Sequence, residues 1–268
     1  MSDKTEQSDT KQQYPPHLYK FRPGSTRNIE NLRNGHIWLP TFDNMNDPHD
    51  GQLDILIEQA VRLHDAIIPL IIRDPSGAPL FSPLTVYSTP PDNRNPLDIE
   101  EKYNLEVKKS QEYCRKLGIY SLSESCRNAL MWAHYADNSS GFCIEYSLYN
   151  SKGQLHPNSQ YYNEIDYVAE YPKIDLQYLK MSSISHSLYQ LLGRKEESWK
   201  YEKEWRSIIL SGGNCTKSHP LPISSIIFGA NLEEPVANRI KTIFKGTDVL
   251  LKKSIKLQGQ FELGVETI

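Results

Sequence analysis

The residues best suited to chemistry lie between Leu130 and Tyr146. These seventeen positions contain a Trp, a His, two Tyr, an Asp and a Glu, separated by apolar side chains. Apolar walls with a few polar groups that orient a ligand are typical of a binding pocket. Trp132, His134 and Tyr135 are therefore candidate ligand contacts, and His134 suits acid–base catalysis because imidazole titrates near neutral pH. The alternative is a half-buried helix whose His and Tyr have ordinary hydrogen-bond partners.

Three other short segments carry residues that complement this group. One expected strand ends on Arg22, and a second contains Ser121 and Ser123, whose side chains point the same way because direction alternates along a strand. A third segment places Glu202 and Glu204 ahead of an apolar strand. Each residue also has a simpler explanation. Arg22 could form a surface ion pair, Ser121 and Ser123 could be half-buried strand serines, and Glu202 and Glu204 could lie on the exposed face of a strand.

The order arginine, Ser-x-Ser, Glu-x-Glu resembles the R-S-E pattern of ADP-ribosyltransferases. The resemblance implies a split antiparallel sheet closed around NAD, which is the substrate. It implies that Arg22 binds the phosphates bidentately and that Ser121 and Ser123 shape the nicotinamide end. Glu204 would stabilise the ribosyl oxocarbenium ion, and Glu202 would orient the acceptor.

The expected site thus divides into two groups. The catalytic candidates are Glu204, Glu202 and His134, and the expected NAD contacts are Tyr19, Arg22, Ser121, Ser123, Trp132 and Tyr135. Further candidates are Asn46, Asp47 and Arg206. For Asn46 and Asp47 the alternative is a capped turn, and for Arg206 it is an ion pair with Glu145 or Glu204.

A second resemblance extends over most of the chain. It is carried by Leu18–Arg22, Ile37-Trp38, Asn46–Asp50, Ser121–Glu124, Met131–Asp137, Gly141–Glu145 and Trp199–Arg206. These motifs, in this order, resemble the bacterial and phage-borne domain-of-unknown-function family 2971. The family implies no particular reaction, but its members occur among predicted phage-defence and toxin-like genes. Together, the two resemblances predict an ADP-ribosyltransferase or NAD glycohydrolase that acts as a defence or toxin effector.

Two other function classes remain open. The same residues would serve a non-enzymatic sensor that binds a nucleotide or a phage component. A nuclease would need Mg²⁺, for which the acidic candidates are Asp47, Asp50, Glu145, Glu202 and Glu204. The chain has no PD-(D/E)xK signature, so the nuclease ranks last and we expect no metal.

Composition favours a cytoplasmic protein. The 268 residues include 30 Lys and Arg against 33 Asp and Glu, so no strong overall field attracts nucleic acid or a membrane. The four cysteines form no CxxC pair, and neither a signal peptide nor a bilayer-length apolar run is present. The expected partners are a nucleotide-type small molecule and a nucleic-acid or protein acceptor, without a membrane. The oligomeric state is left open.

The pattern of elements predicts a disordered tail over residues 1–16 and one α+β domain over 17–268. Strands are expected at 17–22, 36–39, 119–123, 142–146, 165–169, 204–210, 224–228 and 248–264. Helices are expected at 28–33, 53–68, 98–117, 128–136, 174–193 and 232–245, with a long loop at 74–97. The order is not a clean βαβ alternation, so we expect a split, mostly antiparallel sheet with peripheral helices, similar to that of ADP-ribosyltransferases.

Overall fold

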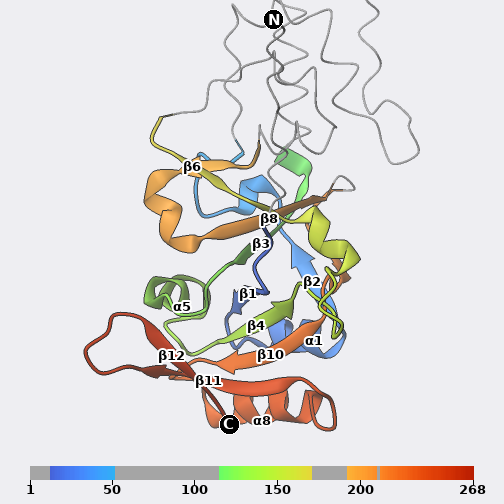
Figure 1. Ribbon diagram of the computed structural model, residues 1–268, viewed down its shortest axis with the longest axis vertical. Coiled ribbons are helices and arrows are strands. Elements are labelled where there is room, and N and C mark those ends of the chain that lie inside the picture. The colour runs from blue at the N-terminus through green and yellow to red at the C-terminus, as the bar shows by residue number, and fades with distance from the viewer. Residues whose placement is uncertain (1–12, 52–114, 171–191, 210–211) are drawn as a thin grey trace, which may run out of the picture.

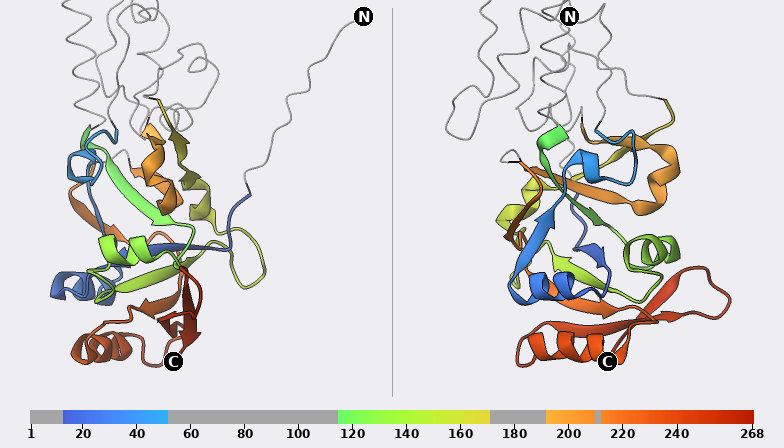
Figure 2. Two further views of the ribbon diagram at one scale, coloured as in Figure 1. Left: turned by 90° about the vertical axis from the view of Figure 1, so that its left-hand side faces the viewer. Right: turned by 180° about the vertical axis from the view of Figure 1, so that it is seen from behind.

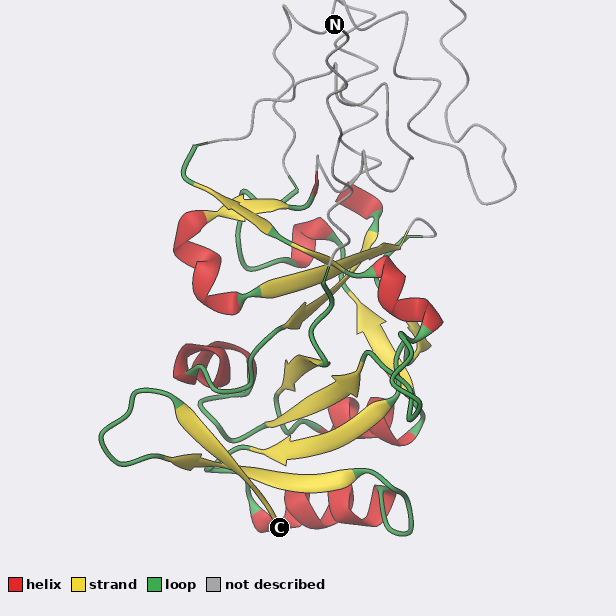
Figure 3. Ribbon diagram, viewed as in Figure 1, coloured by secondary structure: helices red, strands yellow, loops and turns green. Residues whose placement is uncertain are grey.

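The fold is α+β, and within the residues that the structure describes it has a large, open and mostly antiparallel sheet and few helices (Figure 1, Figure 3). The structure, a computed structural model, describes residues 13–51, 115–170, 192–209 and 212–268. The main sheet has the strand order β12-β11-β10-β4-β1-β3-β8-β5. Its strands are β1 (His17–Arg22), β3 (Gly118–Ser123), β4 (Phe142–Ser147), β5 (Asn163–Glu164), β8 (Glu204–Ile209), β10 (Ile223–Phe228), β11 (Leu250–Lys256) and β12 (Leu263–Thr267). Only β10 and β11 pair in parallel within it.

The main sheet is divided between β1 and β3. Strand β1 pairs with β4 along its whole length, from His17–Ser147 to Arg22–Phe142. With β3, by contrast, β1 shares one paired position within the described chain, Tyr19–Ser123. Beyond Tyr19 the Lys20 amine takes the place of the backbone ladder, because it donates to the Ser121 carbonyl over 2.6 Å. The two halves of the sheet therefore diverge at its centre.

Short elements surround this sheet. Two small sheets pair β2 (His36–Leu39) with β9 (Cys215–Ser218) and β6 (Asp166–Val168) with β7 (Arg194–Glu196). The α-helices are α1 (Thr26–Arg33), α5 (Ala129–Tyr135) and α8 (Glu234–Ile243), and the 3-10 turns are η1 (Phe42–Asn44), η3 (Pro157–Tyr161) and η4 (Glu197–Glu202). Ser25 caps α1 and Asn128 caps α5, each by accepting a backbone N–H. No helix in the described ranges has the length and apolar character needed to cross a bilayer.

Two apolar clusters support the site. The larger one fills the space between the main sheet and helices α1 and α8, with Leu18, Ile144 and Trp205 among its buried members. The smaller one lies under α5, where Trp132 meets Phe21 edge to face with ring centroids 5.2 Å apart. Because β1 contributes Leu18 to the first cluster and Phe21 to the second, its backbone is held from both faces.

Most expected elements are present, within two or three residues of their expected ends, but two expectations need correction. The single strand expected over 248–264 is a hairpin, β11 and β12, whose connection contains Gly259 at φ +73°. This hairpin and α8 form one end of the molecule (Figure 2). Part of the expected tail is also held in place, since the Tyr14 carbonyl accepts from the Tyr149 hydroxyl and the Tyr14 ring packs on Trp205.

Several expectations fall outside the described residues. These are the helices at 53–68 and 174–193, the loop at 74–97, most of the helix at 98–117 and the first twelve residues of the tail. Of the strand expected at 165–169, the structure has Asp166–Val168, which pairs with β7 and not with the main sheet.

Candidate functional site

A cavity of about 310 Å³ opens where β1 and β3 diverge. This volume is at the lower end of the range for ligand pockets. Seven of the nine residues expected to contact substrate line it: Tyr19, Arg22, Ser121, Ser123, Tyr135, Glu202 and Glu204. The remaining wall includes Lys20, Trp38, Asn44, Asn46, Met131 and Lys195. Segments far apart in the sequence therefore meet at the division in the sheet.

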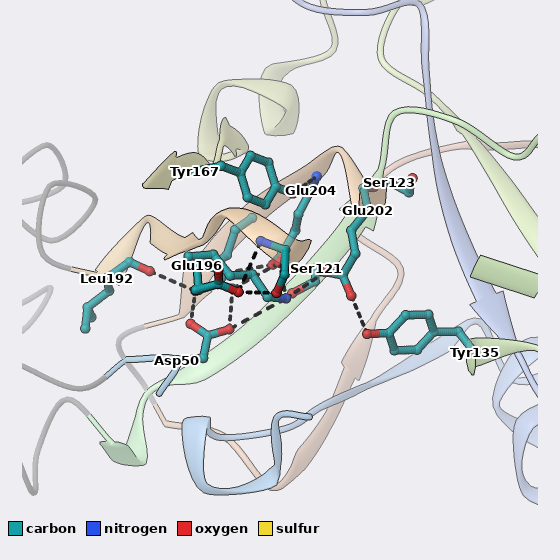
Figure 4. A network of polar contacts seen from close by, with 12 residues as sticks. Asp50, Ser121, Ser123, Tyr135, Tyr167, Leu192, Glu196, Glu202 and Glu204 are labelled. Carbon is teal, nitrogen blue, oxygen red and sulfur yellow. Dashed lines mark hydrogen bonds and ion pairs between the residues drawn. The ribbon is translucent and has the colours of Figure 1, made fainter. Parts of the chain in front are cut away.

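Beneath this cavity lies a network of buried ion pairs (Figure 4). The Lys195 amine is 2.6 Å from a Glu202 oxygen and 3.1 Å from a Glu204 oxygen. Arg206 donates to both oxygens of Asp50, at 2.8 and 2.7 Å, and its Nε donates to Glu204 at 2.7 Å. All five side chains are at most 6% exposed. A network buried to this extent is rigid, because breaking any pair would leave a charged group with neither a partner nor solvent around it.

Strand pairing sets the direction of these side chains. In the β3–β8 ladder Ser123 is opposite Glu204 and Ser121 is opposite Arg206. Opposed residues share a face of a sheet, as do alternate residues of one strand, so these four side chains lie on one face. The expected common direction of Ser121 and Ser123 is thus present in the structure. On the other face Tyr120, Leu122 and Trp205 pack into the larger apolar cluster.

The charges of the network support one another. Burial alone would raise the pKa of Glu204, but Arg206 and Lys195 hold that pKa well below its ordinary value. Burial likewise opposes the charge of Lys195, yet Glu204, Glu202 and Asp50 raise its pKa. The network thus contains three carboxyl groups, Asp50, Glu202 and Glu204, and two basic side chains, Lys195 and Arg206, next to the cavity.

The β1 side of the cavity is cationic. Lys20 and Arg22 both line it. Burial, followed by the nearby charge of Arg22, lowers the pKa of Lys20 to about 7. Lys20 therefore exchanges protons near neutral pH, and an anionic ligand in the cavity would favour its charged form.

A row of buried hydroxyls connects Arg22 with His219. The Arg22 guanidinium interacts with the Tyr120 hydroxyl, which is 2.9 Å from the Tyr146 hydroxyl, and this in turn is 2.7 Å from Nδ1 of His219. Burial and then Arg22 lower the pKa of His219 to about 4. The ring is therefore neutral at pH 7, and its tautomer sets whether Nδ1 donates to or accepts from the Tyr146 hydroxyl. Either direction can continue between the two tyrosine hydroxyls, because each can donate and accept.

Tyr135 joins helix α5 to the network. Its hydroxyl donates to Glu202, and burial together with the negative charge of Glu202 raises the pKa of Tyr135. Asn46 also interacts with this hydroxyl and lines the cavity. The capping of α5 by Asn128 and the burial of Trp132 fix the helix that presents Tyr135.

Besides Arg206, which belongs to the buried network, three expected residues lie outside the cavity lining. Trp132 is fully buried in the smaller apolar cluster, and its ring N–H donates to the Cys126 carbonyl over 2.7 Å. His134 is exposed, with its ring 6.3 Å from that of Tyr135 and 6.1 Å from that of Tyr201. Asp47 is buried and accepts from the backbone N–H of His49, which is the capped-turn arrangement.

Sequence reasoning missed Lys20 and Lys195, and it named Asp50 only as an acid for the metal alternative. Lys195 follows directly on an expected helix, and no residue spacing indicates that it is buried. The ion pair of Arg206 with Glu204 was foreseen as the alternative for that arginine, and it is present; Glu145 instead binds Lys252 at 2.9 Å. Of the acids of the metal alternative, Asp50, Glu202 and Glu204 share the buried network with Lys195, whereas Glu145 and Asp47 have other partners. Within the described ranges, no three His, Cys, Asp or Glu side chains are placed to hold a metal ion.

Fold and site together define an α+β protein with a ligand-sized cavity in a divided sheet, above a buried ion network. A family described as "Protein of unknown function (DUF2971)" matches residues 131–207, which confirms the expected resemblance to that family over this segment. The matched segment contains Lys195, Glu202, Glu204 and Arg206, four of the five network residues. No curated protein and no solved structure matches the chain.

Proposed function

We propose that the protein is an NAD-consuming enzyme of the ADP-ribosyltransferase type. The observation that carries the proposal is the common cavity: the arginine, both serines and both glutamates of the expected pattern line it, although they come from three separate parts of the chain. The mostly antiparallel sheet, with its single paired position between β1 and β3, supports the proposal. We extend the proposal to a cytoplasmic effector in phage defence or toxicity on the resemblance of the sequence motifs.

The cationic wall suits the phosphates of a dinucleotide. Arg22 presents a planar guanidinium, which can hold a phosphate by two parallel hydrogen bonds, and Lys20 adds an ammonium whose charge an anion would favour. The opposite wall offers the Ser121 hydroxyl, which interacts with the Glu204 carboxylate and helps to lower its pKa. A hydroxyl that donates to a carboxylate can still accept a hydrogen bond, for example from the amide of nicotinamide.

The network suits a reaction that develops positive charge. Loss of nicotinamide from NAD breaks the glycosidic bond at C1′ of the ribose, and the bonding electron pair leaves with the nicotinamide. Glu204 is held ionised, so its carboxylate would stabilise the cationic sugar. Its neighbours Arg206 and Lys195 fix the carboxylate in place beside the cavity.

Nicotinamide release by the purified protein tests the proposal. We expect Glu204→Gln to lower the rate at least about a hundredfold, as the loss of one preorganised electrostatic contact does in other enzymes. Glu164→Gln is the matched control, because Glu164 is exposed on the neighbouring strand β5 and does not line the cavity. Arg22→Gln should raise KM for NAD, and it changes no member of the buried network.

Two outcomes would contradict the proposal. One is no nicotinamide release by the wild-type protein even when cell extract supplies acceptors. The other is full release by folded Glu204→Gln and Arg22→Gln variants.

A non-enzymatic sensor is the second candidate, and one observation favours it. Both oxygens of Glu204 already accept hydrogen bonds from Arg206, and one also accepts from Lys195. A carboxylate bound in this way suits permanent recognition of a ligand as well as catalysis. Saturable binding of a nucleotide by isothermal titration, without nicotinamide release, would select this function.

A further inference from the structure

A row of aromatic side chains leads from the cavity onto the surface. It consists of Tyr135, His134, Tyr201 and Trp199, called here the aromatic row. Successive ring centroids are 6.3, 6.1 and 6.2 Å apart. Tyr135 lines the cavity, while the other three come from the end of α5 and from η4, which lie on the same side of the molecule (Figure 1).

The rings keep accessible surface. His134 is exposed, and Tyr135, Tyr201 and Trp199 are half-buried. Neighbouring rings are tilted by 31° to 44°, so they do not cover one another by parallel stacking. The buried side of the row closes the ion network, since the Lys195 amine lies 4.9 Å from the Trp199 ring centroid and Tyr135 binds Glu202. The outer side has no equivalent contact among the described residues.

We propose that the aromatic row binds the bases of a single-stranded nucleic acid and that this strand is the acceptor. The inference rests on the proposed function for its chemistry, but the binding surface is observed independently. Every nucleobase has a flat π face, and a run of aromatic side chains binds single strands by stacking on these faces. A peptide or a folded protein offers few such faces in succession.

The position of the row explains how a base would reach the reacting carbon. A base stacked at His134 and Tyr135 is next to Glu202, which Tyr135 holds at the cavity wall. A nitrogen of that base would form the new bond to C1′ as the bond to nicotinamide breaks, with the electron pair leaving on nicotinamide. Glu202 would accept the proton that the base nitrogen loses. Glu202 thereby serves as the residue that orients the acceptor.

The exposed charges near the row are mixed. Lys200 and Lys203 flank Tyr201, and Arg127 precedes Asn128, whose amide donates to the Tyr201 carbonyl. Glu196 and Glu197 lie at the Trp199 end. The row therefore has no strong positive field, and stacking provides most of the affinity. We expect a shallower salt dependence than for proteins that bind mainly through phosphates.

Fluorescence anisotropy with a fluorescein-labelled 12-nucleotide single strand, without NAD, tests the proposal directly. We expect saturable binding by the full chain, weaker binding of the same sequence as a duplex, and about a tenfold or greater rise in Kd for Tyr201→Leu. Tyr201→Phe keeps the ring and should bind like wild type. His134→Ala changes an exposed side chain, so it should fold normally and should also weaken binding.

Phe261→Leu is the matched control, because Phe261 is a fully exposed aromatic residue in the β11–β12 connection and is not part of the row. Absence of binding by wild type, or unchanged Kd for both Tyr201→Leu and His134→Ala, would overturn the proposal. The outcome is separable from that of the proposed function. Nicotinamide release without oligonucleotide binding would reject the strand but not the transferase, whereas binding without release would reject the transferase and the acceptor role but not the binding surface.

Discussion

At the scale of single residues, Arg206 shows how the network both stabilises the protein and shapes the site. It is fully buried and binds Asp50 through two nitrogens and Glu204 through two more contacts. Replacing it with Met removes both hydrogen bonds to Asp50 and leaves Lys195 to face the three buried carboxyl groups, which costs about 3–5 kcal/mol of unfolding free energy. Urea denaturation measures this loss. The control is Lys245→Met, which also replaces a basic side chain with Met but at an exposed position. Its unfolding free energy should remain within about 0.5 kcal/mol of wild type.

The pKa of His219 predicts a stability change with pH. Folding lowers this pKa from 6.5 to about 4, because of burial and the nearby Arg22 and His36. The unfolded chain therefore binds a proton first, and stability is full above pH 6.5 and is lost as the pH falls toward 4. Allowing for partial exposure, the loss is about 2 kcal/mol. Denaturation at several pH values should show a flatter profile for His219→Gln; an unchanged profile would contradict the assignment.

The pKa of Lys20 predicts how ligand affinity, rather than stability, changes with pH. Its pKa is about 7 in the free protein, and a bound anion raises it. The affinity for ADP-ribose should therefore decrease as the pH rises above 7. Calorimetric titration at pH 6 and pH 9 measures the change. Lys20→Met should bind more weakly at pH 6 and show little difference between the two conditions, whereas Lys20→Arg should keep the strong binding at both.

At the scale of elements, the chain entering strand β4 passes so close to the backbone of Arg22 that the residue before the strand, Gly141, must be glycine. A Cβ on Gly141 would lie 2.1 Å from the Arg22 carbonyl oxygen. Gly141→Ala must move β1 or β4, so we expect a destabilisation of about 1–3 kcal/mol and weaker binding of NAD through Arg22. Thermal denaturation and titration measure the two effects. Gly24→Ala, with its nearest contact at 3.1 Å, should cost less; equal costs would contradict this explanation.

The local sequence predicted the helices and strands that depend on local residue patterns, but not the buried charges that depend on distant contacts. Strands β1, β2, β4 and β10 and helices α1 and α5 have ends within two residues of those expected, and Ser25 and Asn128 cap the two helices in the structure. Gly259, with its positive φ, is a local signal for the hairpin turn. Lys195 was not predictable, because its burial depends on contacts with carboxylates that only the folded chain assembles. The same holds for Asp50, which meets Arg206 across 156 positions.

At the scale of the whole molecule, the site lies where distant segments meet, so site integrity and global stability are coupled. The network links Asp50 near the beginning of the described chain with Lys195 on β7 and Glu204 on β8. Next to the network, strands β1 and β3 are joined by one backbone pair, Tyr19–Ser123. Substitutions in the network should therefore lower the midpoint of global unfolding, and should not merely loosen one loop. Circular dichroism and tryptophan fluorescence should report the same transition.

The whole molecule should also be sensitive to acid but insensitive to salt. Buried pairs are screened little by ions, so raising NaCl to 1 M at pH 7 should change Tm by only a few degrees. Lowering the pH acts on the same groups directly. His219 loses its contribution below pH 6.5, and Glu145 and Glu204, whose pKa values folding lowers, lose theirs as the pH falls below about 4.5. Tm measured by calorimetry from pH 7 to pH 3.5 should fall throughout. A stability maximum near pH 5, or a large loss of Tm in salt at neutral pH, would show that surface charges and not the buried network control stability.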